Sequence, residues 1–226
     1  MTATGTTGAG EAKERAEANP RADTRSHVLE IAARHFAHHG YGATSLRAVQ
    51  REAGVNPATV HYHFGSKEAL YRAVIERSLE SIQSDRLARL ADIPPGLPAR
   101  ERLHALLHAY LAPHLEHATT RTGHHYAQIL AFVQVNPRDA ATDMFDTAVA
   151  PVRQQFADAL AALFPQAKRG QILGALSMAV ANMAMMPIGL GDRSFDRTSM
   201  TAAIDTCVNY TGAGFEKVCG PIAELA

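Results

Sequence analysis

The sequence predicts an all-α protein. Apolar residues recur three and four positions apart along most of the 226-residue chain, which is the spacing that places side chains on one face of a helix. Proline, glycine and capping residues divide the chain into segments of helical length. No segment alternates apolar and polar residues as a half-buried strand would.

The N-terminal third of the chain contains three short, closely spaced helices. The first is expected from Thr24 to a stop at Gly40, because Val28, Ile31 and Phe36 recur at helical spacing. The 23 residues before it consist of small and charged residues, which is typical of a disordered arm.

A turn containing Gly54 joins the second and third helices. Thr44 is the expected N-cap of a helix over Ser45–Ala53. Asn56 is the expected N-cap of a helix over Pro57–His63, whose first position suits proline because no N–H is needed there. Two short helices joined in this way form a helix-turn-helix, and the second helix can enter the DNA major groove, which is about 12 Å wide.

Longer helices follow. Ser66 is expected to cap a helix that extends to Ala91, with Ile75, Leu79 and Ile82 on its buried face, and "DIPPGLP" ends it. The later helices are expected over Ala99–His117, Arg121–Val135, Asp139–Leu163, Lys168–Met186 and Ser199–Cys219. We divide the chain into an arm (1–23), a helix-turn-helix domain (24–70) and a larger helical domain (71–226).

Charge and cysteine content narrow the class of protein. The net charge is zero, so affinity for nucleic acid requires a local patch, and Arg21 to Arg77 has an excess of three positive charges. Cys207 and Cys219 lie about 18 Å apart on one predicted helix, too far for a disulfide. No apolar run is long enough to span a membrane, and the N-terminus lacks a signal-peptide core. We therefore expect a cytoplasmic protein with no membrane partner.

The segment "SLRAVQREAGVNPATVHYHFGSKEALYRAV" resembles the TetR family of transcriptional regulators. Its pattern A-G-V-x-x-x-T-x-x-x-H-F-x-S-K-E-x-L spans one supersecondary unit at fixed spacing. The resemblance implies an N-terminal three-helix DNA-binding domain, a C-terminal helical ligand-binding and dimerisation domain, and a homodimer on a palindromic double-stranded DNA operator. Ala58 and His61 stand where the family often has glycine and tyrosine, and Gln50 replaces a customary small residue, so the operator sequence does not transfer.

The resemblance also implies which residues contact DNA. Contacts to the backbone are expected from Thr44, Thr59, Tyr62, His63 and Lys67. Contacts near the bases are expected from Asn56, Pro57, Ala58 and His61, with Arg47 reaching the groove.

The last two predicted helices resemble the pair through which family members dimerise, and small residues in "LGALSMAVANMAMM" suit close helix packing. Packing inside one chain is the alternative for this pair. Few charges in the central helices favour a small hydrophobic effector, and a faint likeness to fatty-acyl-responsive members makes an acyl compound one candidate. The expected ligand-binding residues are Tyr110, His125, Tyr126, Ile129, Phe132, Phe145, Met178 and Met183.

Twelve histidines keep a second class of function open. The pairs His104/His108 and His114/His117 have helical spacing, so a histidine-based metal sensor or metal-dependent enzyme is the alternative. Solvated or capping roles are the preferred interpretation, because no further ligand motif completes either pair. We expect no catalysis, cofactor or metal. The leading hypothesis is an effector-released repressor, with the Ser66–Ala91 helix as its hinge, and a constitutive architectural DNA binder is a third possibility.

Overall fold

The computed structural model describes residues 20–135, 140–189 and 197–223, and every regular element within these ranges is an α-helix. The all-α prediction is therefore confirmed for this part of the chain. The helices are α1 (Pro20–Ala43), α2 (Leu46–Ala53), α3 (Pro57–Phe64), α4 (Lys67–Ala91), α5 (Ala99–Ala118), α6 (Arg121–Val135), α7 (Ala140–Leu163), α8 (Arg169–Gly189) and α9 (Arg197–Cys219).

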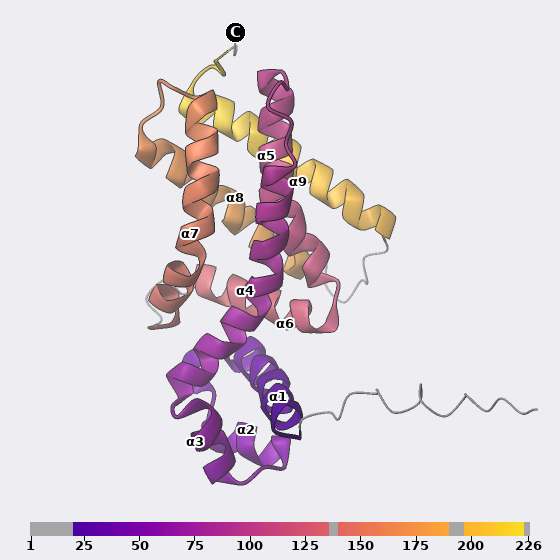
Figure 1. Cartoon of the computed structure of the whole chain (residues 1–226), viewed down its shortest axis with the longest axis vertical. Coiled ribbons are helices and arrows are strands. Elements are labelled where there is room, and N and C mark those ends of the chain that lie inside the picture. Colours follow the sequence, from indigo (N-terminus) through magenta and orange to yellow (C-terminus); the bar gives the residue numbers. More distant parts are fainter. Residues whose placement is uncertain (1–19, 136–139, 190–196, 224–226) are drawn as a thin grey trace, which may run out of the picture.

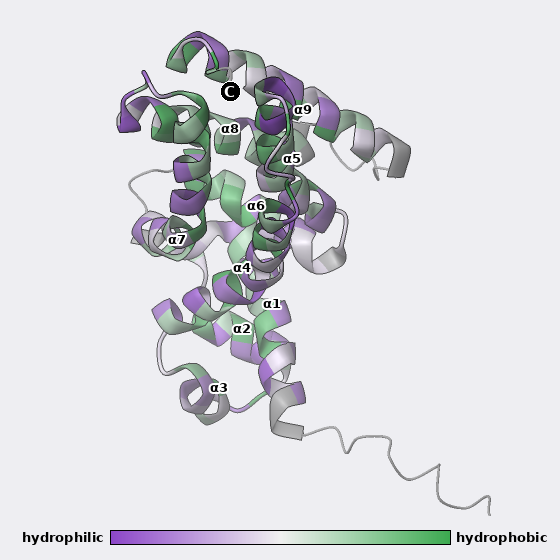
Figure 2. Ribbon diagram, turned by 45° about the horizontal axis from the view of Figure 1, so that its top comes forward, coloured by the Kyte–Doolittle hydropathy of each residue, from purple (hydrophilic) through white to green (hydrophobic). Residues whose placement is uncertain are grey.

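Helices α1, α2 and α3 form one end of the molecule, and α4 leads from that end into a larger body built from α5 to α9 (Figure 1). Figure 2 shows hydrophobic residues gathered where the helices of this body face one another. One cluster of buried hydrophobic residues extends from Val28 in α1 to Cys219 in α9. The predicted boundary after residue 70 falls inside α4, so the two parts share a helix and a core.

The start of α1 differs from the prediction. The helix begins at Pro20, four residues earlier than expected, while residues 1–19 of the predicted arm lie outside the described residues. Both cysteines are free thiols, as predicted from their spacing, and both are buried. No helix within the described ranges is long and apolar enough to cross a membrane.

Two of the three predicted N-caps of α2, α3 and α4 are confirmed. Asn56 Oδ1 accepts a hydrogen bond from the Ala58 N–H at 2.9 Å, and Ser66 Oγ accepts one from the Ala69 N–H at 3.0 Å. Thr44 is not the cap of α2, because Ser45 occupies that position. The Thr44 side chain instead turns inward, and its hydroxyl donates to the Gly40 carbonyl oxygen at 2.8 Å.

Side-chain contacts fix the three short helices to one another and to α4. Phe36, Tyr41 and Tyr71 form an aromatic cluster between α1 and α4, with the Phe36 and Tyr71 ring centroids 4.9 Å apart in an edge-to-face arrangement. Glu52 of α2 accepts hydrogen bonds from His35 and Arg34 of α1, and the bond from His35 contributes most to lowering the pKa of the Glu52 carboxyl. The orientation of α2 therefore follows that of α1.

Gly40 interrupts α1, as the sequence predicts, and brings it against α6. Its backbone has φ 70° and ψ 174° within an otherwise helical segment. A Cβ atom at this position would lie 2.4 Å from Cζ of Phe132, so the absence of a side chain permits the close approach. Phe132 belongs to α6, and the contact joins α1, at one end of the molecule, to the larger body.

We expect Gly40→Ala to be strongly destabilising. The left-handed φ costs about 1–2 kcal/mol for an L-residue, and overpacking against Phe132 adds roughly 1–3 kcal/mol. Gly65→Ala is the matched control, because Gly65 has φ 72° but no atom lies within 4 Å of the point that its Cβ would occupy. Urea unfolding of both variants gives the comparison, and equal losses in the free energy of unfolding would show that the Phe132 contact is not restrictive.

Candidate nucleic-acid interface and internal cavity

Helix α3 presents a polar, exposed face at the end of the molecule. Val60 and Phe64 are buried and fix α3 against its neighbours. Successive helical residues are about 100° apart, so Ala58 and Tyr62 lie on the opposite, outer side. Tyr62 is 76% exposed, which is unusual for so large a side chain, and His61 is exposed on one flank. This face can approach a long surface without rearrangement of the core.

Helix α2 adds a pair of exposed cations. Arg47 was predicted from the family pattern, and Arg51 lies one turn further along the same helix face. Neither forms an ion pair with another residue in the described ranges. Arg51 was not predicted, although its spacing of four from Arg47 was a usable signal.

Lys67 is held in place by the end of α1. Its Nζ donates to the Gly42 carbonyl oxygen at 3.0 Å and lies 4.7 Å from the centroid of the Tyr41 ring. An ammonium group has three donors, so it retains capacity for a phosphate oxygen. Thr44, by contrast, is 3% exposed, and its hydroxyl hydrogen is used within the protein, which gives it a structural role in α1 and α2.

The other predicted DNA-contacting residues are accessible. Asn56, Pro57 and Ala58 are exposed, while Thr59 and His63 are half-buried. The structure thus gathers nine of the ten predicted residues on the exposed or partly exposed surface of α2, α3 and the start of α4. Their contacts with DNA stay a prediction.

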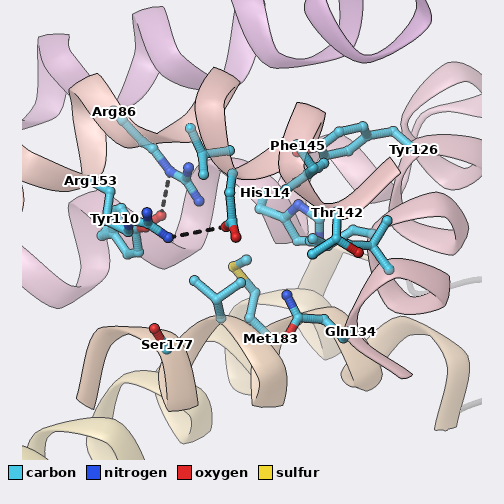
Figure 3. A pocket seen from close by; sticks show the side chains of 15 residues that line it. Arg86, Tyr110, His114, Tyr126, Gln134, Thr142, Phe145, Arg153, Ser177 and Met183 are labelled. Carbon is cyan, nitrogen blue, oxygen red and sulfur yellow. Dashed lines mark hydrogen bonds and ion pairs between the residues drawn. The ribbon is translucent and has the colours of Figure 1, made fainter. Parts of the chain in front are cut away.

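A cavity of about 240 Å³ lies where α4, α5, α6, α7 and α8 meet (Figure 3). The exposed residues Gln134, Asp146 and Ser177 contribute to its lining and mark its opening to the surface. Its lining comprises Arg86, Tyr110, His114, Tyr126, Leu130, Val133, Gln134, Thr142, Phe145, Asp146, Val149, Arg153, Ser177, Val180 and Met183.

Two charged groups with different surroundings face this cavity. Arg153 Nη1 lies 3.4 Å from Oδ1 of Asp146, a partly exposed ion pair. Arg86 is only 4% exposed; its Nε donates to the Tyr110 carbonyl oxygen at 2.7 Å, and its guanidinium lies 4.3 Å from the Tyr110 ring centroid. No carboxylate in the described part of the chain lies within 4 Å of Arg86. A buried guanidinium without a counter-ion is uncommon in proteins.

Burial determines the protonation of the neighbouring groups. His114 is 1% exposed, and burial, together with the positive charge of Arg86, lowers the pKa of His114 to about 3. Its ring is therefore neutral at pH 7. Burial also raises the pKa of Tyr126, so the phenol keeps its proton. His114 Nε2 has no hydrogen-bond partner among the described residues.

Four of the eight predicted ligand-binding residues line the cavity: Tyr110, Tyr126, Phe145 and Met183. The other four lie elsewhere. His125 faces α1, with its ring 6.4 Å from that of His38, and Phe132 lies against Gly40. Ile129 is buried in the core, and Met178 is exposed beside α9. The side of α6 that faces the cavity comprises Tyr126, Leu130, Val133 and Gln134, which sequence spacing alone did not distinguish.

The histidine predictions need one correction. His104 is exposed as expected, but His114 is neither solvated nor a cap, because it lies in the stretch of α5 from Ala109 to Leu115, which is buried throughout. His108 and His117 are half-buried. Across the described ranges, no three His, Cys, Asp or Glu side chains come close enough to hold a metal ion. The metal-sensor alternative therefore finds no support there.

Comparison with known families decides the identity of this architecture. Residues 28–74 match a family model described as bacterial regulatory proteins of the tetR family, and residues 108–214 match one described as a tetracyclin repressor-like C-terminal domain. The chain belongs to the TetR family. The first match contains α2 and α3 entire, and the second contains most of the cavity-lining residues.

Individual TetR-family relatives agree with this assignment. The transcriptional regulatory protein RaaS of Mycobacterium tuberculosis is 41% identical over 76 residues, 33% of this chain and 35% of the relative. The aligned segment thus spans about a third of that relative. Among solved structures, the regulator FadR of Bacillus halodurans superposes with a TM-score of 0.61 at 14% identity, covering 84% of this chain and 98% of FadR.

The ketosteroid transcriptional regulator KstR2 of Mycobacterium tuberculosis superposes equally well, with a TM-score of 0.61 at 15% identity over 89% of this chain and 95% of KstR2. At such identities these likenesses show the fold of the TetR family and nothing about the ligand.

Proposed function

We propose that this TetR-family protein is a homodimeric transcriptional repressor, which binds a palindromic DNA operator and leaves it when a small effector occupies the cavity. The observation that best supports DNA binding is the outer face of α3, where Ala58, His61 and Tyr62 are exposed together at the tip of the molecule. The exposed Arg47 and Arg51 of α2 supply positive charge beside it.

Dimerisation is supported by an apolar groove between α8 and α9. The groove has a volume of about 590 Å³, and Met178 and Tyr210 in its lining are 68% and 69% exposed. Leu176 and Met183 of α8 point instead into the core, so the two faces of α8 serve two different contacts. A second copy of the same surface, related by a two-fold axis, would cover the exposed face and place two α3 helices on two half-sites.

The cavity supports control by an effector rather than a constitutive architectural role. Leu130, Val133 and Phe145 give it apolar walls, which suits the hydrophobic effector expected from the sequence. Arg86 and His114 also line it, so a purely hydrophobic molecule would match only part of the site. An acyl compound remains one candidate.

Two structural connections could transmit occupancy of the cavity to α2 and α3. Arg86 lies on α4, the helix that begins with Lys67, and α6 contributes both Val133 to the cavity and Phe132 to the contact with Gly40. The Gly40 carbonyl in turn accepts the Thr44 hydrogen bond just before α2. An effector can favour a conformer with a different spacing of the two α3 helices only to the extent that it binds that conformer more tightly than the DNA-binding one.

Operator selection from fragments of the source genome, followed by binding titrations with variants, tests the DNA-binding role. We expect Tyr62→Phe to weaken binding to all DNA sequences about fivefold, because one hydroxyl–phosphate hydrogen bond is worth about 1 kcal/mol. Lys67→Gln should also reduce the dependence of log K on log salt by about one. His61→Ala should change the preferred DNA sequence instead. This variant is easier to interpret than one at Asn56, because Asn56 also caps α3 and its loss would affect the helix itself.

Arg100→Gln on α5 is the matched control for loss of a cation, since its side chain is 80% exposed in the larger body. It should leave both affinity and salt dependence unchanged. A Lys67→Gln protein with the wild-type salt dependence, or a His61→Ala protein with the wild-type sequence preference, would contradict the assigned contacts.

A further inference from the structure

Arg86 stands on the buried stripe of α4, where an apolar residue would be expected. Tyr71, Ile75, Leu79 and Ile82 precede it at spacings of three or four, and all are buried. Replacing a stripe residue by a guanidinium has an energetic cost, because a charge loses its hydration without gaining an opposite charge. The ring and carbonyl of Tyr110 compensate only part of that loss.

The guanidinium retains unused hydrogen-bonding capacity on its cavity side. Arginine has five N–H donors in a planar fork. In Arg86, Nε donates to the Tyr110 carbonyl oxygen and Nη1 donates to Gln83 Oε1 at 3.4 Å. Nη2 of Arg86 donates to no group within the described ranges. Figure 3 shows the guanidinium directed from α4 toward the centre of the cavity.

A second polar group faces the same space without a partner. His114 comes from α5, and its Nε2 is buried with no hydrogen bond to any described residue. Because the ring is neutral at pH 7, one of its nitrogens is a hydrogen donor and the other an acceptor. Buried polar atoms are almost always paired in native proteins, so an unpaired Nε2 beside a cavity points to a ligand atom.

Among the described residues that line the cavity, the charges do not balance. Arg86 and Arg153 contribute two guanidinium groups, Asp146 contributes one carboxylate, and His114 is neutral. Asp146 is paired with Arg153, so one positive charge, that of Arg86, is left for the ligand. Tyr126, Phe145 and Met183 offer apolar surface to the rest of the molecule. The volume of about 240 Å³ is smaller than that of a typical drug-sized site.

We propose that the cavity binds a small monocarboxylate, whose carboxylate pairs with Arg86 and His114 and whose apolar body lies against Tyr126, Phe145 and Met183. This inference deepens the proposed function by naming the chemical class of its effector. Arginine suits this role because its planar fork matches the two oxygens of a carboxylate. Arg86 lies roughly 28 Å along α4 from Lys67, so the anion would act directly on the helix that reaches the DNA-binding end.

Calorimetric titration of the full chain, without DNA, tests this proposal. The probes are aliphatic acids from butanoate to decanoate, benzoate and phenylacetate, each paired with its primary amide, and inorganic phosphate. At least one carboxylate should bind at least tenfold more tightly than its amide. Equal binding of acid and amide, stronger binding of phosphate than of every carboxylate, or no carboxylate binding at millimolar concentration would overturn the proposal.

Arg86→Met separates ligand binding from a structural role. The unliganded variant should unfold at the same temperature as the wild type or higher, because methionine fills similar space without a buried charge, while the carboxylate affinity should fall about tenfold or more. Unchanged carboxylate affinity would overturn the assignment. If this variant does not fold, the comparison of acid and amide binding to the wild-type protein still tests whether the cavity binds a carboxylate. DNA binding is measured separately, so a carboxylate that binds without releasing operator DNA would contradict the repressor mechanism and leave this inference intact.

Discussion

Met178→Arg is expected to convert the dimer into a monomer and to lower operator affinity by roughly 10²- to 10⁴-fold, because the second half-site would no longer be bound intramolecularly. Met178 is 68% exposed in a single chain, so the substitution should leave the fold of the protomer intact. In the dimer it would place an unpaired charge within an apolar contact, which is strongly unfavourable. Sedimentation velocity and operator titration measure the two effects.

Gln155→Arg provides the matched control for this experiment. Gln155 is exposed on α7, outside the groove between α8 and α9, and the same charge there should change neither the assembly state nor the operator affinity. If Met178→Arg still sedimented as a dimer, the groove between α8 and α9 would not be the dimer contact. A monomer with full operator affinity would argue against a palindromic site.

Acidification is expected to destabilise the wild type more than His114→Leu. In the unfolded chain the histidine binds a proton below about pH 6.5, whereas in the folded protein burial lowers the pKa of His114 to about 3. Between these values the unfolded state binds more protons, so the free energy of unfolding falls as the pH falls. Full stability from this group is present above pH 6.5, and the loss reaches roughly 2–3 kcal/mol at pH 4.5.

Urea unfolding at pH 7 and pH 4.5 measures this difference. Burial also lowers the pKa values of His117 and His125, so the wild type should lose stability through several groups, and subtraction of the His114→Leu result isolates one of them. His104→Leu, an exposed position on the same helix, is the matched control for replacing a histidine by leucine. Equal pH dependence in the wild type and His114→Leu would mean that His114 is protonated in the folded protein.

Local sequence signals predicted the helices within a few residues. Asn56 and Ser66 were identifiable as caps because a cap needs only its own side chain and the next turn of backbone. Thr44 was misassigned since two adjacent hydroxyl residues, Thr44 and Ser45, suit the position equally. The choice between them depends on Gly40, whose carbonyl oxygen accepts a hydrogen bond from the Thr44 hydroxyl at the point where Gly40 interrupts α1.

The cavity was only half predictable, because helical periodicity identifies a buried face but not what it is buried against. His104 and His114 are both histidines on α5, yet one is exposed and the other faces the cavity. The sequence does not distinguish Arg86 from Arg89. In the structure, Arg89 pairs with Asp85 and Glu116 at the surface, whereas Arg86 is buried. The usable signal for Arg86 was its place on the stripe that contains Ile75, Leu79 and Ile82.

The all-α class, the helix-turn-helix and the family resemblance could be recognised without a structure, since each follows from residues close together in the chain. The packing of the helices, in contrast, shows that α4 to α8 surround a cavity and that Arg86 faces it with no carboxylate partner in the described part of the chain. The reason is physical: the burial of a group and the balance of charge around it depend on side chains from five helices far apart in sequence. No local pattern contains that information.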